Sequence, residues 1–550
     1  MSEASSRAAP EAPAPETPWA ARTVATALAD GLGTAGVRRV FGVPGGSAGA
    51  EIIEAASRAG LSFTLAHTEV AGAFMACAQA ELSGVPGVCI ATLGPGVASV
   101  ANGVAHAYLD RVPLLVLTDR HPSDLRDTVL HQTFDHSALL GPVTKSTEQL
   151  TIDGGQVGRA LRLASTLPSG PVHLDCAADV LQAAAADQLP ERVAAGERAS
   201  RDGLSEAARR LLRDSRRPVV LVGLGARRTE DAIAIRHLAE LKGTPVLVTY
   251  KAKGVMPDEH PLFAGVFTDG ALEAPIVDAS DLIIAIGLDP VELLPRRWRH
   301  SQPVIYLGAW SLEQRQMPIA ASIVGDVASL VAQLEPEIAE SAWDPAEIAS
   351  SATAARDALR VASRDGLAPS VVVDAAASVF VGARVTVDAG AHMFPAMGLW
   401  AASSPNDMLI SNGLATMGFS LPSAIGAALA EPSRTVVAFT GDGGLLMCAS
   451  ELRTAARERL PVKTIVFDDA SLSLIRIKQE QRGYEPLGVD LRGVDWSRLG
   501  EAFGVASFRA TNEVELRRCL AMAAKIPGPA LISAKVDGTV YPETMRRLRG

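Results

Sequence analysis

Residues 440–474 read TGDGGLLMCASELRTAARERLPVKTIVFDDASLSL, and this stretch decides the fold. An apolar run ends in a Gly-Asp-Gly-Gly loop that contains Asp442, a helical pattern follows, and a second apolar run ends at Asp469. The order of strand, helix and strand predicts a βαβ unit with parallel strands. Ligands bind at the carboxyl ends of such strands, so both acidic groups are expected at one edge of the sheet.

The loop 441–444 suits a phosphate and a metal ion. Its glycines allow backbone N–H groups to approach a phosphate closely, and the helix that follows directs its positive end to the same place. Asp442 and Asp469, which lies 27 positions later, supply the carboxylates that Mg²⁺ combines with phosphate oxygens. Because Gly-Asp-Gly alone is more often a plain turn, the pairing with the second strand-end acid is what supports a site.

Composition indicates a large globular protein with several domains. The chain has 550 residues, 48% of them hydrophobic, and a formal net charge of −10. The acidic balance and the lack of a Lys/Arg-rich run argue against a nucleic-acid partner. No apolar segment reaches the roughly 18 residues of a membrane span, and the first residues resemble no signal peptide. The five widely spaced cysteines favour a reduced, cytoplasmic location.

Short apolar runs alternate with helical patterns along most of the chain, which predicts parallel sheets. We expect a disordered tail over 1–17 and an N-terminal domain over 18–185. A central domain is expected over 204–338 and a C-terminal domain over 367–545. The predicted fold class is therefore α/β, with three successive domains that contain mostly parallel sheets.

These residues resemble a known family. Gly-Asp-Gly followed by a strand-end Asn or Asp is similar to the signature of thiamine diphosphate-dependent enzymes, in particular the group of acetolactate synthases, pyruvate oxidases and 2-oxo acid decarboxylases. The resemblance implies a pyrimidine-binding, a central and a diphosphate-binding domain. It also implies Mg²⁺ bound by the side chains of Asp442 and Asp469 and by the carbonyl oxygen of Ser471. An asparagine is usual at position 469, so the aspartate adds a negative charge beside the diphosphate.

The same resemblance assigns a proton relay. TLAHTEVAGAF is similar to the family's strand-Glu-helix segment, which places Glu69 against the cofactor's pyrimidine ring. The family commonly has His immediately before this Glu, whereas here Thr68 stands there and His67 comes two before. On an extended segment His67 and Glu69 would point to the same side, so His67 is either a second acid/base or, more often, a core histidine.

Further segments complete the implied site. VDAGAHMFPAM and ISNGLATMGF resemble the family's diphosphate-contacting turn and the segment with the apolar wedge under the cofactor. The implied cofactor-binding residues are Glu69, Gly390, Ala391, His392, Ala415, Met417, Gly441, Asp442, Gly443, Gly444 and Asp469. Gln132 stands at the family's active-site glutamine position, where it either holds the substrate or satisfies loop backbone.

The choice of substrate is less constrained. Lys478 occupies the position where related synthases carry an aromatic residue, and it either favours an anionic second substrate or belongs to a solvated helix face. In the central domain, Gly223 and Gly225 follow a strand, but Arg228 interrupts the dinucleotide fingerprint, so bound FAD is doubtful.

The resemblance implies decarboxylation of a small 2-oxo acid, after which the enamine is protonated or captured by an acceptor carbonyl, as in acetolactate synthases. The alternatives are an FAD-containing, oxidase-type relative and a non-catalytic scaffold that binds thiamine diphosphate. Glu69 and Asp442 lie in different domains, and in the family these come from different chains. We therefore expect a homodimer or homotetramer with active sites at the subunit interface.

Overall fold

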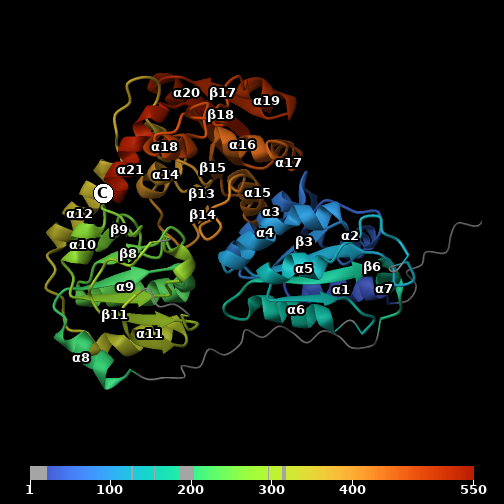
Figure 1. Cartoon of the computed structure of the whole chain (residues 1–550), viewed down its shortest axis with the longest axis horizontal. Helices are drawn as coiled ribbons and strands as arrows, with labels where there is room; N and C mark the ends of the chain where they lie inside the picture. Colours follow the sequence, from blue (N-terminus) through green and yellow to red (C-terminus); the bar gives the residue numbers. More distant parts are fainter. Residues whose placement is uncertain (1–21, 126–127, 154, 186–203, 295, 313–316) are drawn as a thin grey trace, which may run out of the picture.

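The computed structural model describes residues 22–125, 128–153, 155–185, 204–294, 296–312 and 317–550. Three lobes follow one another along the chain (Figure 1). Each contains a six-stranded sheet in which all neighbouring strands are parallel. The predicted fold class is confirmed. The expected tail, 1–17, and the segment 186–203 between the first two expected domains lie outside the described residues.

The first sheet has the strand order β2-β1-β3-β4-β6-β5. Its strands are β1 (Arg39–Gly42), β2 (Ser62–Leu65), β3 (Gly87–Ala91), β4 (Leu114–Arg120), β5 (Ser146–Gln149) and β6 (Pro171–Ala177). Its helices are α1 (Val24–Thr34), α2 (Ala48–Arg58), α3 (Glu69–Ser83), α4 (Pro95–Leu109), α5 (His136–Leu140), η1 (Gly141–Val143), α6 (Gln156–Ser165) and α7 (Ala178–Gln182).

The second sheet has the order β12-β11-β10-β7-β8-β9, which is the arrangement of a doubly wound nucleotide-binding fold. Its strands are β7 (Pro218–Val222), β8 (Val246–Val248), β9 (Phe263–Val266), β10 (Leu282–Ile286), β11 (Val304–Gly308) and β12 (Ile319–Val324). The helices are α8 (Glu206–Asp214), η2 (Leu224–Ala226), α9 (Thr229–Lys242), α10 (Ala274–Asp278), η3 (Pro290–Glu292), α11 (Val327–Leu334), η4 (Glu335–Glu337) and α12 (Pro345–Ala358).

The third sheet repeats the order of the first, as β14-β13-β15-β16-β18-β17. Its strands are β13 (Arg384–Val387), β14 (Met408–Ile410), β15 (Val436–Gly441), β16 (Val462–Asp468), β17 (Ala506–Ala510) and β18 (Ala530–Lys535). Its helices are α13 (Pro369–Val379), α14 (Met393–Leu399), α15 (Ser420–Ala430), α16 (Asp442–Cys448), α17 (Glu451–Arg457), α18 (Ser473–Gln481), α19 (Trp496–Ala502), α20 (Glu513–Ala524), η5 (Gly538–Val540) and α21 (Tyr541–Arg549). From β13 the strand order runs to β14 on one side and to β15 on the other, and the crevice at such a switch point is where ligands bind.

The apolar runs predicted the inner strands, but one edge strand of the first sheet and one of the third lack that signal. β5 and β17 each lie at the end of their sheet. β5 has the sequence STEQ and β17 the sequence ASFRA, and most of their side chains are partly or fully exposed. An edge strand packs fewer apolar neighbours than a central strand, so its sequence reads as a loop.

One hydrophobic cluster spans the first and third lobes. Each of these lobes also has a cluster of its own, and the buried residues of the second lobe cluster separately. Helices α3 and α15 lie in direct backbone contact, because a Cβ atom on Gly426 would lie 2.3 Å from the carbonyl oxygen of Met75. Phe74 and Phe419 meet edge to face across this boundary, with ring centroids 5.4 Å apart. Within the part of the chain that the structure describes, no helix has the length and apolar character of a membrane span.

Candidate cofactor site

A cavity of about 190 Å³ opens at the switch point of the third sheet. It lies at the carboxyl ends of β13, β15 and β16, as expected for parallel strands. Many of the residues proposed from the sequence line it together: Gly390, Ala391, His392, Ala415, Met417, Gly441, Asp442, Gly443, Gly444, Asp469 and Ser471. Glu69, Gln132 and Lys478 do not line it.

The two strand-end carboxylates meet at one backbone amide. The Ser471 N–H donates to Asp442 Oδ2 and to Asp469 Oδ1, at 3.1 Å in both cases. Ala470 stands between the second acid and this amide with φ +58°, a left-handed conformation that turns the chain sharply after β16. The parallel register of β15 and β16 thus brings together groups that are 27 residues apart.

Burial and mutual repulsion act on this carboxylate pair. Burial raises the pKa of Asp442, and the charge of Asp469 raises it further. Burial also raises the pKa of Asp469, while hydrogen bonds from Ser473 and Ser471 and the charge of Arg476 oppose that rise. Two like charges held together in this way are stabilised by a cation.

The donor set fits a hard divalent ion and a phosphate. Two carboxylates and the Ser471 carbonyl are oxygen ligands of the kind that Mg²⁺ prefers, although that carbonyl also accepts the Ser473 N–H at 2.9 Å. The described residues contain no group of three or more His, Cys, Asp or Glu that could hold a metal. The remaining ligands would therefore come from phosphate and water. His392 Nε2 and Ser471 Oγ are buried without a hydrogen-bond partner among the described residues, and both residues line the cavity.

His392 is held as a neutral ring in this wall. Burial lowers its pKa to about 3, and the ring stacks on Phe467 at a centroid distance of 5.2 Å. A Cβ atom on Gly390 would lie 2.7 Å from its ring atoms, so only glycine lets the turn pass the imidazole this closely.

Asp388 is a positioning residue that the sequence reasoning missed, although it stands in the VDAG segment. Its fully buried carboxylate accepts the N–H groups of Gly418, Phe419 and Ser420, at 2.7 to 3.1 Å. It therefore caps the start of α15 and fixes the end of the loop that carries Met417. A Cβ atom on Gly444 would lie 2.1 Å from Asp388 Oδ2, so this approach also requires a glycine in α16.

Glu69 and Gln132 come together at a different place, the start of α4. Glu69 Oε1 lies 3.2 Å from the position that a Cβ atom on Gly96 would take, and the Gln132 Cβ lies 2.7 Å from that position on Gly94. Gln132 adopts φ +59° and lines a separate cavity of about 390 Å³ at the carboxyl ends of β4 and β6. Within one chain, these two residues are not part of the C-terminal cavity.

His67 does not share the orientation of Glu69. Thr68 caps α3, and the chain changes from extended to helical between the two side chains. The His67 ring contacts Thr454 Oγ1 at 3.0 Å, and the His67 N–H donates to Glu451 Oε1 at 2.8 Å. These contacts of His67 join the β2–α3 turn of the first lobe to α17 of the third lobe.

Lys478 lies on α18, whose first turn borders the cavity. Ile475 lines the cavity, and Lys478 follows three positions later on the same helical face. The Lys478 side chain is exposed. Lys478 therefore stands one helical turn from a residue of the cavity wall and does not itself line the cavity.

In the central domain, a carboxylate of the chain itself binds the first turn after β7. Glu292 Oε2 accepts the N–H of Leu224 at 2.9 Å, in the first turn after β7, where a dinucleotide fold binds pyrophosphate. Glu292 also accepts a hydrogen bond from Thr249 Oγ1 at 2.5 Å. A Cβ atom on Gly225 would lie 2.9 Å from the Trp310 ring. The Leu224 amide is thus already bound by Glu292, while a cavity of about 490 Å³, lined by Gly225 and Trp310 among others, lies beside it.

Comparisons with known proteins agree with this architecture. Three family models match the chain: the N-terminal binding domain of thiamine pyrophosphate enzymes over residues 22–139, the central domain over 205–334 and the C-terminal binding domain over 388–534. Together with the fold and the cavity, these matches show that the chain belongs to the thiamine pyrophosphate enzymes.

The individual relatives include acetolactate synthases and a decarboxylase. A probable 2-ketoarginine decarboxylase of Pseudomonas aeruginosa is 31% identical over 543 residues, which cover 95% of each chain. The large subunit of acetolactate synthase isozyme 1 of Escherichia coli is 30% identical over 92% of this chain and 93% of its own. An acetolactate synthase of Bacillus subtilis is 28% identical over 93% and 92%. The chain is thus similar, over nearly its whole length, to both synthases and a decarboxylase.

Proposed function

We propose that this protein catalyses the decarboxylation of a small 2-oxo acid with thiamine diphosphate and Mg²⁺. The observation that carries the proposal is the single cavity that gathers the residues expected from the sequence at the switch point of the third sheet. When bound, thiamine diphosphate supplies an electron sink for the carbanion that loss of carbon dioxide leaves. The acyl unit is then protonated to an aldehyde or joined to an acceptor carbonyl.

The chain's residues have distinct proposed roles. Asp442, Asp469 and the Ser471 carbonyl hold Mg²⁺, while backbone groups at Gly390, Ala391 and Gly441–Gly444 and the His392 ring face the diphosphate. Met417 is the apolar wedge, and the Ala415 carbonyl faces the pyrimidine. With the cofactor bound, Glu69 would form a hydrogen bond with a ring nitrogen of the pyrimidine, which would favour the proton transfer that activates the cofactor.

We further propose that the active unit is a homodimer or homotetramer. Glu69 and Gln132 lie at the start of α4 and do not line the C-terminal cavity of their own chain. A second copy would have to present them to that cavity, where Gln132 donates its amide to the substrate carboxylate or developing oxyanion. The hydrogen bond from Leu224 to Glu292 disfavours the FAD-containing, oxidase-type alternative, because a flavin pyrophosphate would need the same N–H.

The experiment is an assay of carbon dioxide release with product analysis. Purified protein with thiamine diphosphate and MgCl₂ is incubated with pyruvate and with larger 2-oxo acids, alone and with acceptor aldehydes or 2-oxo acids. We expect Glu69→Gln to lower kcat by at least about a hundredfold. The exposed-surface control Glu54→Gln, from the Glu54–Arg58 pair on α2, should retain activity.

Mass spectrometry of the products separates the two fates of the acyl unit. A free aldehyde indicates decarboxylation, and an acetohydroxy acid or acyloin indicates carboligation. If no 2-oxo acid turns over and Glu69→Gln binds thiamine diphosphate as the wild type does, the protein is a non-catalytic binder and the proposed function is wrong.

A further inference from the structure

The loop 411–417, which carries Ala415 and Met417, is supported by one face of α4 from the first domain. Asn102 and His106 lie four residues apart on this helix, and Asp110 follows after four more. Asn102 Nδ2 donates to Thr416 Oγ1 at 3.2 Å, and His106 Nδ1 lies 3.0 Å from Ser411 Oγ. Both ends of the loop are therefore attached to α4.

Asp110 makes the strongest of these attachments. Its carboxylate is fully buried and accepts the backbone N–H of Asn412 at 3.1 Å and of Gly413 at 2.6 Å. Hydrogen bonds to an ionised acceptor are roughly twice as strong as neutral ones. The charge of Asp110 thus holds the first part of the loop, provided that its burial is compensated.

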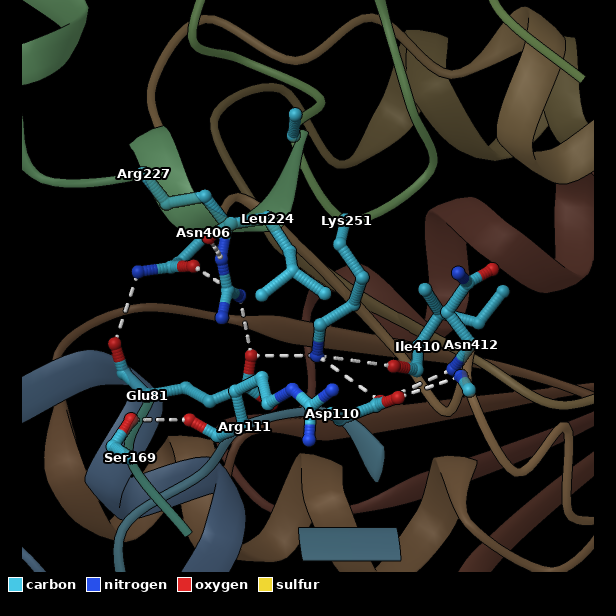
Figure 2. A network of polar contacts seen from close by, with 12 residues as sticks. Glu81, Asp110, Arg111, Ser169, Leu224, Arg227, Lys251, Asn406, Ile410 and Asn412 are labelled. Atoms are coloured by element: carbon cyan, nitrogen blue, oxygen red, sulfur yellow. Dashed lines mark hydrogen bonds and ion pairs between the residues drawn. The ribbon is translucent and has the colours of Figure 1, made fainter. Parts of the chain in front are cut away.

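Lys251 of the central domain supplies that compensation. Its side chain is 1% exposed, and Nζ lies 3.4 Å from Asp110 Oδ2 and 2.7 Å from Glu81 Oε2. The same ammonium donates to the carbonyl of Ile410 at 3.2 Å, directly before the loop. Figure 2 shows Lys251 between Glu81 and Asp110, with Ile410 and Asn412 beside it. One cation therefore contacts the first domain and the third.

The loop is closely packed at Gly413. A Cβ atom on Gly413 would lie 2.7 Å from Val291 Cγ2 of the central domain and 2.8 Å from the Cβ of Leu109 at the end of α4. Side chains of the first and central domains thus pack against this short segment of the third domain. A charge removed from such a buried cluster leaves its partner uncompensated, which destabilises the folded arrangement when the partner cannot reach water.

We propose that Asp110 and Lys251 are positioning residues that fix the loop 411–417, and with it Met417, before the cofactor binds. The central domain would thus contribute to the active site, because its residue Lys251 neutralises the Asp110 carboxylate that binds the loop. The inference rests on the proposed role of Met417 as the wedge.

The chain contains a matched control. Lys253 stands two residues from Lys251, is also fully buried, and pairs with the carboxylate of Asp258 at 2.5 Å. Asp258 also accepts the Ala402 N–H at 3.3 Å, so this pair joins the central and third domains away from the loop. Lys253→Met and Lys251→Met therefore remove the same kind of buried charge, but only Lys251→Met removes support from the loop 411–417.

The first measurement is hydrogen–deuterium exchange of the full-length protein without cofactor, read on peptides spanning 408–417. We expect Lys251→Met to raise the exchange rate of the Asn412 and Gly413 amides by about tenfold or more, and Lys253→Met to leave it at the wild-type value. Asp110→Asn is expected to raise it as well, because a neutral amide oxygen is a weaker acceptor for two N–H groups. Equal exchange in wild type and Lys251→Met, or an equal rise in Lys253→Met, would overturn the proposal.

The second measurement is the dissociation constant for thiamine diphosphate at saturating MgCl₂, followed by tryptophan fluorescence. Lys251→Met is expected to weaken binding about tenfold, and Lys253→Met to bind as the wild type does. If Lys251→Met does not fold, Asp110→Asn replaces it, because this change weakens the acceptor for the Asn412 and Gly413 amides. A wild-type protein that binds no thiamine diphosphate would refute the proposed function, while the exchange result would still decide the role of Lys251.

Discussion

Asp442 and Asp469 share one hydrogen-bond donor, the Ser471 amide, at 3.1 Å from each carboxylate. Asp469→Asn removes one of two buried like charges, so we expect a higher thermal midpoint in the metal-free protein, by a few degrees. The neutral amide also binds a cation less strongly, and we expect Mg²⁺ affinity measured with thiamine diphosphate to fall about tenfold.

The control for this change is Asp468→Asn, on the preceding residue of β16, whose carboxylate accepts a hydrogen bond from Ser533 at 3.4 Å. It should leave Mg²⁺ affinity near the wild-type value. An Asp469→Asn protein with unchanged affinity and unchanged thermal midpoint would mean that the carboxylate pair is not the metal site.

Lys478 is expected to select the charge of the substrate side chain. Lys478→Glu should lower kcat/KM for 2-oxoglutarate about tenfold and raise it for 2-ketoarginine, because the new charge repels one side chain and attracts the other. Arg518→Glu, an equal charge reversal on the exposed face of α20, should change neither value. If both variants behave alike, Lys478 belongs to a solvated helix face.

Glu292 should exclude flavin from the central domain. Its carboxylate already accepts the Leu224 N–H that a pyrophosphate would need. We expect purified protein to show no flavin absorption band, and added FAD to leave the thermal midpoint unchanged. Stoichiometric flavin released on denaturation would contradict this expectation and would restore the oxidase-type alternative.

His173 should make the protein sensitive to acid. Its ring is fully buried, and burial lowers the pKa to about 4 from an ordinary value of 6.5. The unfolded chain therefore binds a proton that the folded chain excludes between these values, and the free energy of unfolding falls as the pH falls from 6.5 towards 4. The contribution of this residue is at most about 1.4 kcal/mol per pH unit.

His173→Gln should flatten this dependence in urea unfolding at a series of pH values. His237→Gln, at a histidine whose side chain is 64% exposed, should leave it as it is. Equal slopes in all three proteins would show that another group controls acid unfolding.

Most of this architecture could be predicted from the sequence, because its strands and strand ends are marked by residues close together in the chain. Gly-Asp-Gly after an apolar run marks a strand end, and parallel pairing brings Asp442 to Asp469 without any further contact being known. Asp388 gave no such signal, because its role depends on Gly418 and Thr440, which only the tertiary fold brings to it.

The long-range contacts could not be predicted from the sequence either. Lys251 and Asp110 are more than a hundred residues apart, in different domains, and nothing in either segment predicts that they meet. The strand β5 was missed because its polar sequence, STEQ, carries no apolar period. Glu69 and His67 share an extended-strand period in the sequence, but helix α3 begins between them and separates their directions.

In the proposed dimer, helix α4 would contact residues of two different active sites. Its first turn contacts Glu69 and Gln132, which would serve the partner's cofactor, while Asn102 and His106, further along the same helix, contact the Met417 loop of their own chain. Fifteen residues of α-helix make a stiff rod of about 22 Å. The two reaction centres of a dimer would thus be mechanically coupled, and a displacement at one could be transmitted to the other along a single rigid element.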